Sequence, residues 1–548
     1  MTGHIINTVT MLQVIFVCMY FMAKGTCQNE AETLPSYWND VAAAELQRAK
    51  ALKPIEKPAK NIILFVGDGM GITTTFAARV LKGQLRNASG EETLLSFEEF
   101  PYVGMSRTYS IDKQTTDSAA TATAFLSGIK NNYGALGVDG RVKRGDCPAA
   151  LQYNVTSIAH WAMAAGKSVG IVTTTRVTHA TPAAAYAHSA DRGWEGDSEM
   201  TSVTGGCSDI AKQLVDDNPD IKVILGGGRR YFRPIDAIDP ETGTNDTSNG
   251  RRDGRDLIED WMENKAERNA THRYVWNLAE FNEVDPESVD FLLGLFSNSH
   301  MKYEIDRRDG PTGNEAGEPS LSQMTEKAIQ ILQKDPDGFF LLVEGGRIDH
   351  GHHGSRAARA LHDTVAFEEA VTTATKITSE DDTLTVVTAD HSHVFTVGGY
   401  ADRGNPILGK SGSSGRDGLP YTSLLYGNGP GYDVVDNGGT FGRPNLTDTD
   451  TEERLYRQQS AVPLGSETHG GEDVGIYAQG PMAHLFHGVH QENYIAHVMA
   501  YAGCIGAYRD SGQCAQPEVT TPPVTPRSGA TANEVCFLLF VVIIGLVF

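Results

Sequence analysis

Basic residues are scarce in this 548-residue chain, where 46 Lys and Arg stand against 69 Asp and Glu and leave a formal net charge of −23. So negative a surface repels nucleic acid, which excludes DNA and RNA as structural partners. It also repels phosphate esters. A chain that acts on phosphate esters would need strong local positive charge, and bound metal ions are the obvious source of it.

Long hydrophobic runs are also lacking, and the two that come nearest lie at the chain ends. The first covers residues 11–22 and is followed by small residues at Gly25-Thr26, just before Cys27. Although no Lys or Arg precedes it, this pattern predicts a signal peptide over residues 1–27, cleaved near Cys27. The alternative interpretation is a buried helix.

The second run, Val535–Phe548, ends the sequence and is too short for a comfortable membrane span. Small residues at Ser528-Gly529-Ala530 and a polar spacer precede it, which is the pattern of a GPI-anchor signal. We therefore expect a stalk at residues 511–530, with Ser528 as the attachment candidate, and an anchor propeptide at residues 531–548. The expected location is the extracellular face of the cell membrane.

Cysteine is rare as well, and three of the seven cysteines fall in the predicted terminal signals. The remaining four are an even number, which is consistent with two disulfides in an oxidising compartment. We expect the pairs Cys147–Cys207 and Cys504–Cys514. Five glycosylation sequons fit a secreted chain, at Asn87, Asn154, Asn245, Asn269 and Asn445.

Short apolar runs alternate with helical stretches along the chain, and no internal repeat is present. This alternation predicts an α/β fold with a large, mostly parallel central sheet flanked by helices on both faces. The expected strands are 62–66, 169–172, 223–225, 339–343 and 384–387, and the expected helices include 30–50, 158–165 and 322–333. We expect the catalytic domain to span residues 28–510, with a polar surface insertion at 236–290 and a loop-rich inserted subdomain at about 400–460.

Side chains that bind metals follow four of these strands. In an open parallel sheet, ligands bind outside the carboxyl ends of the strands. One Asp after a strand is usually a turn or a helix cap, but four ends that gather Asp, His and Thr at one edge favour a binding site. These residues are Asp68, His179, Thr181, Glu344, Asp349, His350, His353, Asp390, His391 and His393.

The mixture of Asp and His suits zinc, which accepts oxygen and nitrogen ligands in open catalytic sites. Asp349 and His353 are four residues apart and would face the same way on a helix. His469 lies further along, and taken alone its sequence context favours a structural role.

A candidate nucleophile lies in the segment Thr116-Asp117-Ser118, which opens an Ala-rich and helix-forming run. Ser118 falls at the predicted helix start, and a helix N-terminus supports an anion. The alternative is that Asp117 and Ser118 only cap the helix.

Six of these segments together resemble the alkaline phosphatases. The motifs occur in family order, and the resemblance covers about residues 35–505: GDGMG (67–71), DSAATATA (117–124), TTTRVTHATPA (173–183), VEGGRIDHGHH (343–353), TADHSHVF (388–395) and ETHGGEDV (467–474). The animal, GPI-anchored branch is the most similar, and an insect gut enzyme is one interpretation within it. Sulfatases and cofactor-independent phosphoglycerate mutases share the superfamily core but lack this Asp-Ser-Ala context.

The resemblance implies hydrolysis of small phosphate monoesters at alkaline pH by a homodimer with two Zn²⁺ and one Mg²⁺ per chain. Ser118 would be the nucleophile and form a phosphoserine, and Arg192 would clamp two phosphate oxygens. The expected ligands are Asp349, His353 and His469 for one zinc, Asp68, Asp390 and His391 for the zinc next to Ser118, and Asp68, Thr181 and Glu344 for magnesium. His179, His350 and His393 would lie behind the ligands.

Relatives also carry a structural calcium site with a carboxylate just after a Leu-Phe pair and an Asp further on. Here Leu295-Phe296 is followed by Ser297, although Asp306 is present, so the sequence leaves calcium binding open. Thr181 stands where relatives often have Ser, an exchange that keeps the hydroxyl.

Other patterns favour structural roles. His484, His487 and His490 are interpreted as packing or surface residues, and Arg229 and Arg230 as part of a strand-end turn. Arg251, Arg252 and Arg255 are interpreted as a solvated face. Two other functions are alternatives: an anchored surface receptor, suggested by the stalk and the sequons, and a phosphodiesterase or sulfatase of the same superfamily.

Overall fold

The structure is a computed structural model that describes residues 30–309, 317–436, 439 and 441–514. The predicted signal peptide, most of the stalk, Ser528 and the anchor propeptide lie outside the described residues. Within the described ranges, none of the helices combines the length and the apolar character that crossing a membrane requires.

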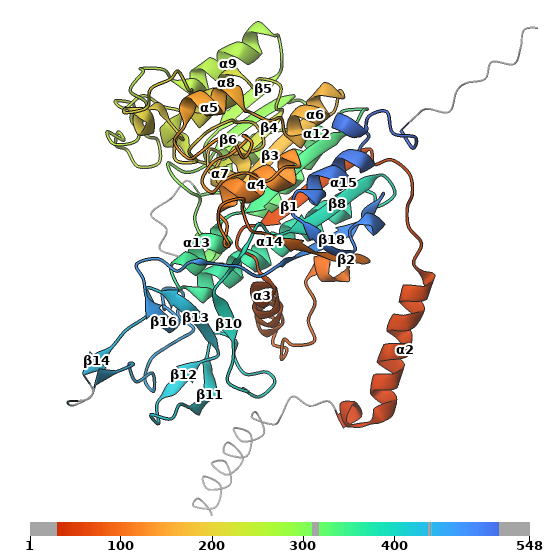
Figure 1. Cartoon of the computed structure of the whole chain (residues 1–548), viewed down its shortest axis with the longest axis vertical. Coiled ribbons are helices and arrows are strands. Elements are labelled where there is room, and N and C mark those ends of the chain that lie inside the picture. The colour runs from red at the N-terminus through yellow and green to blue at the C-terminus, as the bar shows by residue number, and fades with distance from the viewer. Residues whose placement is uncertain (1–29, 310–316, 437–438, 440, 515–548) are drawn as a thin grey trace, which may run out of the picture.

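A ten-stranded sheet forms the centre of the molecule, in the order β19-β2-β18-β8-β1-β7-β3-β4-β6-β5 (Figure 1). Neighbouring strands run parallel except β18, which is antiparallel to both β8 and β2. The predicted α/β fold with a mostly parallel sheet is therefore confirmed. The strands are β1 (Asn61–Gly67), β2 (Tyr102–Arg107), β3 (Ser168–Arg176), β4 (Val223–Gly227), β5 (His272–Val275), β6 (Phe291–Leu295), β7 (Phe339–Gly345), β8 (Thr383–Thr388), β18 (Val474–Gln479) and β19 (Gly488–Gln491).

Helices cover both faces of this sheet, because its central strands are apolar on both sides. In β1, Ile62, Leu64 and Val66 belong to one buried cluster, whereas Ile63 and Phe65 belong to the other. A strand buried on both faces reads as a continuous apolar run, which is why the sequence predicted this one. The first layer contains α4 (Ser118–Ser127), α6 (Ile158–Ala164) and α15 (Tyr494–Ala502), and the second contains α3 (Ile72–Gln84), α12 (Leu321–Leu332) and α14 (Ala357–Ile377).

Apart from α2 and α9, the remaining helices have at most seven residues, and they lie mostly in the connections between strands. They are η1 (Glu30–Thr33), α2 (Pro35–Ala51), η2 (Ser96–Glu99), α5 (Cys147–Gln152), α7 (Ala180–Ala183), η3 (Asp197–Met200), α8 (Ile210–Asp216), η4 (Arg229–Tyr231), α9 (Leu257–Glu267), α10 (Leu278–Glu283), α11 (Glu304–Asp309), α13 (Arg347–His353), η5 (Ala483–Leu485) and η6 (Gly506–Tyr508).

The helix α2 differs from the other α-helices that the structure describes in that none of its 17 residues is buried. It stands apart from the sheet and its covering helices in Figure 1. Trp38 and Leu46 are more than half exposed on it. The preceding η1 is tied to the body of the protein by an ion pair between Glu32 and Arg403.

The loop-rich subdomain lies below the carboxyl end of the sheet in Figure 1 and holds small sheets. Its strands are β10 (Phe395–Val397), β11 (Lys410–Ser414), β12 (Pro420–Thr422), β13 (Leu424–Gly429), β14 (Val435–Asp436), β15 (Phe441–Gly442) and β16 (Ser460–Pro463). Two further strands, β9 (Ser392–His393) and β17 (His469–Gly470), pair with each other and bring His469 opposite His393.

Two expectations about exposed segments are wrong. Part of the expected surface insertion belongs to the main fold, because β5 pairs with β6 at the sheet edge and Trp261 of α9 is buried. Arg251 is fully buried rather than solvated and forms ion pairs with Asp209 and Asp253. A guanidinium next to two carboxylates can be buried because its charge is compensated.

Both expected disulfides, Cys147–Cys207 and Cys504–Cys514, are present. The five sequon asparagines are all exposed. Their glycosylation stays a prediction.

Candidate metal centre

The expected metal-binding side chains meet at the carboxyl ends of β1, β7 and β8. Asp68 directly follows β1, Glu344 lies near the end of β7, and Asp390 follows β8, and all three carboxyl groups are fully buried. Gly69 allows the backbone that follows β1 to lie directly against the ring of His393. Its φ is +71° and an added Cβ would lie 2.4 Å from His393 Nε2, while its N–H donates to Asp390 Oδ1 at 2.9 Å.

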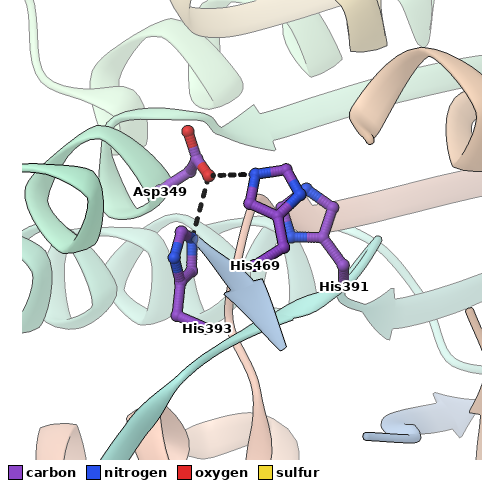
Figure 2. A group of neighbouring side chains, drawn as sticks. All are labelled: Asp349, His391, His393 and His469. Carbon is purple, nitrogen blue, oxygen red and sulfur yellow. Dashed lines mark hydrogen bonds and ion pairs between the residues drawn. The ribbon is translucent and has the colours of Figure 1, made fainter. Parts of the chain in front are cut away.

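Around Asp349, three imidazoles converge on one carboxylate oxygen. The Nε2 atoms of His393, His353 and His469 lie 2.9, 3.2 and 3.3 Å from Asp349 Oδ1. Figure 2 shows two of these rings, His393 and His469, each joined by a dashed line to the same oxygen of Asp349, with His391 stacked behind His469. Burial alone would raise the pKa of Asp349, but the imidazoles, where they carry a proton at Nε2, outweigh it and hold this pKa well below its usual range.

The tautomers of two of these histidines follow from their other ring nitrogens. His353 Nδ1 donates to the Glu467 carbonyl at 2.5 Å, and His469 Nδ1 donates to the Thr116 carbonyl at 2.8 Å. Their Nε2 lone pairs are therefore left facing each other at 3.2 Å, with no proton for a hydrogen bond between neutral rings. A cation held by Asp349, His353 and His469 would satisfy all three groups, and this donor set suits zinc.

A second group surrounds His391. Its Nε2 lies 3.1 Å from Asp390 Oδ2, 3.5 Å from Asp68 Oδ1 and 3.2 Å from Ser118 Oγ. Burial lowers the pKa of His391 to about 4, so the ring is neutral and can act as a ligand. Burial and the carboxylates of Asp390 and Asp349 raise the pKa of Asp68 well above its usual value. A cation among these groups would remove the repulsion that produces this shift.

A third group contains oxygen donors. Both carboxylate oxygens of Asp68, Thr181 Oγ1 and Glu344 Oε1 are buried and have no hydrogen-bond partner among the described residues. Buried polar atoms without partners are costly, so a ligand for them is indicated. Oxygen donors fit Mg²⁺, which prefers carboxylate and hydroxyl or water oxygens.

Ser118 is the first residue of α4 and is 2% exposed. The preceding Asp117 caps this helix, because its Oδ1 accepts from Ala120 N at 3.3 Å. The same carboxylate also holds Arg192, whose Nη1 lies 3.0 Å from Asp117 Oδ2. The capping interpretation is thus correct for Asp117, and the cap also brings Ser118 and Arg192 to the same place.

Arg192 lies on a loop that is fixed by its neighbour Asp191. Asp191 binds Arg144 through two hydrogen bonds of 2.9 and 3.0 Å. Arg192 Nη2 donates to His179 Nε2 at 3.1 Å. The planar guanidinium fork matches two oxygens of a phosphate group, which a lysine could not do.

Behind Arg192 lies a trio of neutral imidazoles. The rings of His179 and His350, both named from the sequence, are 5.4 Å apart, and His300 joins them at 5.2 and 4.3 Å. Burial lowers the pKa of all three well below its usual value. His300 was missed because nothing in its local sequence Ser299-His300-Met301 resembles a ligand motif.

At the positions compared with the calcium site of relatives, Asp306 and the Ser297 carbonyl have partners within the protein. Asp306 forms ion pairs with Arg359 at 2.6 Å and Arg454 at 3.6 Å. The Ser297 carbonyl accepts from Gly228 N and Arg229 N. Among the described residues, no group of three or more potential metal ligands includes Asp306.

The patterns interpreted as structural have structural partners. His487 donates to the His484 carbonyl and His490 stacks on Tyr494 at 4.1 Å. Arg229 follows a glycine turn and is buried against Asp239.

Comparison with known proteins places these observations in one family. The model of the family described as alkaline phosphatase matches residues 59–505. The tissue-nonspecific alkaline phosphatase of Rattus norvegicus is 53% identical over 499 residues, which cover 89% of this chain and 93% of that protein. The human isozyme is 52% identical over 504 residues, covering 90% and 94%. The alkaline phosphatase of Gadus morhua is 50% identical over 485 residues, covering 88% and 99%.

Solved structures share the fold. The alkaline phosphatase of Thermus thermophilus matches with a TM-score of 0.57 at 24% identity, covering 83% of this chain and 93% of that one. A cold-active enzyme from Shewanella sp. matches with a TM-score of 0.55 at 26% identity, covering 81% and 99%.

Proposed function

The chain belongs to the alkaline phosphatase family, and we propose that it hydrolyses phosphate monoesters to an alcohol and inorganic phosphate. One observation carries the proposal: Ser118 Oγ, at the start of α4, lies 3.2 Å from His391 Nε2, within the cluster of Asp68 and Asp390. A nucleophilic oxygen beside a metal-binding group is what phosphoryl transfer through a serine requires.

We propose two zinc ions and one magnesium ion as cofactors. Asp349, His353 and His469 would hold one zinc, and Asp68, Asp390 and His391 the other. Asp68, Thr181 and Glu344 would hold magnesium. The bound ions would supply positive charge against the phosphate oxygens and lower the pKa of an oxygen nucleophile.

The residues of the chain have separate tasks in this reaction. Arg192 orients the phosphate through two of its oxygens. Ser118 Oγ, having lost its proton to solvent, forms a bond to phosphorus while the bond to the alcohol oxygen breaks, which gives a phosphoserine and the alcohol. Water then forms a new bond to phosphorus, the Ser118–phosphorus bond breaks, and inorganic phosphate leaves. The N-terminus of α4 favours the negative charge at Ser118.

The pH dependence follows from the ligands. Imidazoles and carboxylates bind metals only when deprotonated, and Ser118 must also lose its proton to react. Activity should therefore rise with pH into the alkaline range.

Replacement of Ser118 with Ala tests the nucleophile. We expect turnover of nitrophenyl phosphate to fall by several orders of magnitude, and acid-quenched enzyme to yield no phosphoserine. Ser127→Ala, at the other end of α4, is the matched control and should keep turnover near that of the natural chain. Near-natural turnover by Ser118→Ala would refute the assignment.

A second experiment separates the neighbouring activities. Rates on nitrophenyl phosphate, bis-nitrophenyl phosphate and nitrophenyl sulfate should favour the monoester by a wide margin. A preference for the diester or the sulfate would instead favour a phosphodiesterase or a sulfatase.

We further propose that the chain is GPI-anchored on the extracellular face of the membrane. The terminal sequence patterns, the exposed sequons and the two disulfides support this location. Phospholipase C specific for phosphatidylinositol should release the enzyme from intact cells. Activity that stays with the cells after this treatment would contradict the anchor.

A homodimer is the proposed assembly. It is supported by α2, which exposes Trp38 and Leu46 and buries no residue of its own. Light scattering should give twice the mass of one chain. A chain that begins at residue 53 should dissociate more readily, and a monomeric natural chain would contradict the proposal.

A further inference from the structure

Glu467 lies two residues before His469, in the segment between β16 and β17, and is 1% exposed. Its carboxylate accepts two hydrogen bonds. Oε2 accepts from His393 Nδ1 at 2.5 Å, and Oε1 accepts from Val394 N at 2.9 Å. Both oxygens of this buried carboxylate are therefore used within the protein.

The main chain of Glu467 binds a second histidine. Its carbonyl accepts from His353 Nδ1 at 2.5 Å, and its N–H donates to the His353 carbonyl at 3.0 Å. One residue thus fixes two imidazoles, His393 through its side chain and His353 through its main chain.

Both of these imidazoles aim their other nitrogen at the same atom. His393 Nε2 lies 2.9 Å and His353 Nε2 lies 3.2 Å from Asp349 Oδ1. A ring that is held at Nδ1 can turn very little about its side-chain bonds, so the position of Asp349 depends on where Glu467 holds the rings.

The segment that carries Glu467 is itself fixed. Thr468 N donates to Asn428 Oδ1 at 3.0 Å, and the next residue, His469, is paired with His393 in the short β9–β17 ladder. The ring of His393 is also packed against that of His352, with centroids 4.8 Å apart. Hydrogen bonds and ring contacts therefore connect the loop-rich subdomain, through the segment that carries Glu467, to the imidazoles around Asp349.

We propose that Glu467 is a positioning residue, which orients His393 and His353, and through them Asp349, so that zinc is bound tightly at this group. This inference rests on the proposed zinc site. It assigns Glu467 no contact with the substrate. Removing a residue that holds a metal ligand commonly weakens metal binding by about 10–100-fold.

The variant Glu467→Gln keeps the volume of the side chain but replaces one accepting oxygen with an NH₂ group. An NH₂ group donates and cannot accept, so whichever of His393 and Val394 faces it loses its hydrogen bond, while the remaining oxygen keeps the other. The main-chain bonds to His353 remain. Glu467→Ala removes both side-chain bonds. Glu452→Gln, an exposed acid of the same subdomain, is the matched control.

The first measurement is zinc release from the zinc-loaded, full-length enzyme into a chromogenic chelator, which does not depend on activity. We expect Glu467→Gln to release one of its two zinc ions about tenfold faster than the natural chain and than Glu452→Gln. Glu467→Ala should release it faster still. Unchanged release from Glu467→Gln, with an unchanged melting temperature, would overturn the proposal.

The second measurement is turnover against added zinc, which separates positioning from chemistry. Saturating zinc should restore kcat of Glu467→Gln to within about threefold of the natural value, while half-maximal activity requires about tenfold more zinc. A lowered kcat at saturating zinc with an unchanged zinc requirement would place Glu467 in the chemistry and overturn the positioning role. If the natural enzyme itself lacked phosphatase activity, the proposed function would fail while the zinc-release result still stood.

Discussion

Asp117 Oδ2 lies 3.0 Å from Arg192 Nη1, while Oδ1 of the same carboxylate accepts N–H groups from Ala120 and from Gly134 at 3.3 and 2.9 Å. One side chain therefore caps α4 and fixes the guanidinium that would bind the phosphate. The helix that begins with Ser118 and the arginine cannot move independently of each other.

Replacement of Asp117 with Asn should loosen Arg192, since the charge-assisted contact is lost while the cap can remain. We expect the inhibition constant for inorganic phosphate to rise by about tenfold. Inhibition of nitrophenyl phosphate turnover by phosphate measures this directly. Asp146→Asn makes the same exchange at the exposed N-cap of α5, where no arginine of the described residues is bound, and serves as the control; an equal effect of both variants would contradict the link to Arg192.

Metal removal should destabilise the fold as well as abolish activity. Burial raises the pKa of Asp68. Without cations, the nearby carboxylates of Asp390, Asp349 and Glu344 raise it further. We expect EDTA to lower the melting temperature by several degrees, and zinc with magnesium to restore it, because a ligand that binds only the folded state stabilises it. Calorimetry with and without the metals measures this, and an unchanged melting temperature would count against a metal centre in these residues.

The buried Arg251 gives a prediction with an adjacent control. Arg251→Met should lower the stability by about 3–5 kcal/mol, because it leaves the buried carboxylate of Asp209 without its partner. Arg252→Met, at the exposed neighbouring position, should change the stability by less than about 0.5 kcal/mol. Urea unfolding of the two variants compares them. A similar loss of unfolding free energy in the two variants would mean that the ion pairs of Arg251 contribute little to stability.

Asp363 should make the stability of the fold depend on pH, and it lies outside the metal centre. Burial raises the pKa of this carboxyl to about 8, whereas the ordinary value is 3.8. The folded state therefore holds a proton that the unfolded state has lost, and stability should fall as the pH rises from about 4 to 8.

The variant Asp363→Asn cannot ionise and should lose this part of the pH dependence. Since one pKa unit corresponds to about 1.4 kcal/mol, we expect it to be more stable than the natural chain by at least about 1–2 kcal/mol at pH 9. At pH 4 the two should differ little. Urea midpoints of the two proteins at both pH values give the comparison. If the variant differed from the natural chain in stability by the same amount at pH 4 and at pH 9, the titration of Asp363 would be ruled out as the source of that difference.

The central strands could be predicted from the sequence because burial on both faces makes them continuous apolar runs, as in β1 and β7. The strands β2, β18 and β19 could not. Polar or glycine residues interrupt them, and they belong to the sheet only because of pairing between segments far apart, such as Ile476 with Gly104. Trp261 similarly belongs to the core through tertiary packing that its polar surroundings in the sequence conceal.

In the site, position after a strand was sufficient to single out Asp68, Glu344 and Asp390. Ser118 lies at a helix start, Arg192 on a loop and His469 in the two-residue strand β17, and only the family motifs pointed to their roles. Glu467 went unnoticed although it is two residues from His469, since an acid near a ligand has many uses and only its contacts with His393 and His353 distinguish it.

The order of the strands has a consequence for the synthesis of the protein. β1 ends at Gly67, yet both of its neighbours in the sheet come much later, β7 beginning at Phe339 and β8 at Thr383. At about 5–20 residues per second, a ribosome needs roughly 15–55 s to make the residues between β1 and β7. During that time the apolar segment Ile62–Val66 has neither of its partner strands, so in the nascent chain it is a site where aggregation with other chains must be prevented. The centre of the sheet can form only when nearly the whole domain has been synthesised.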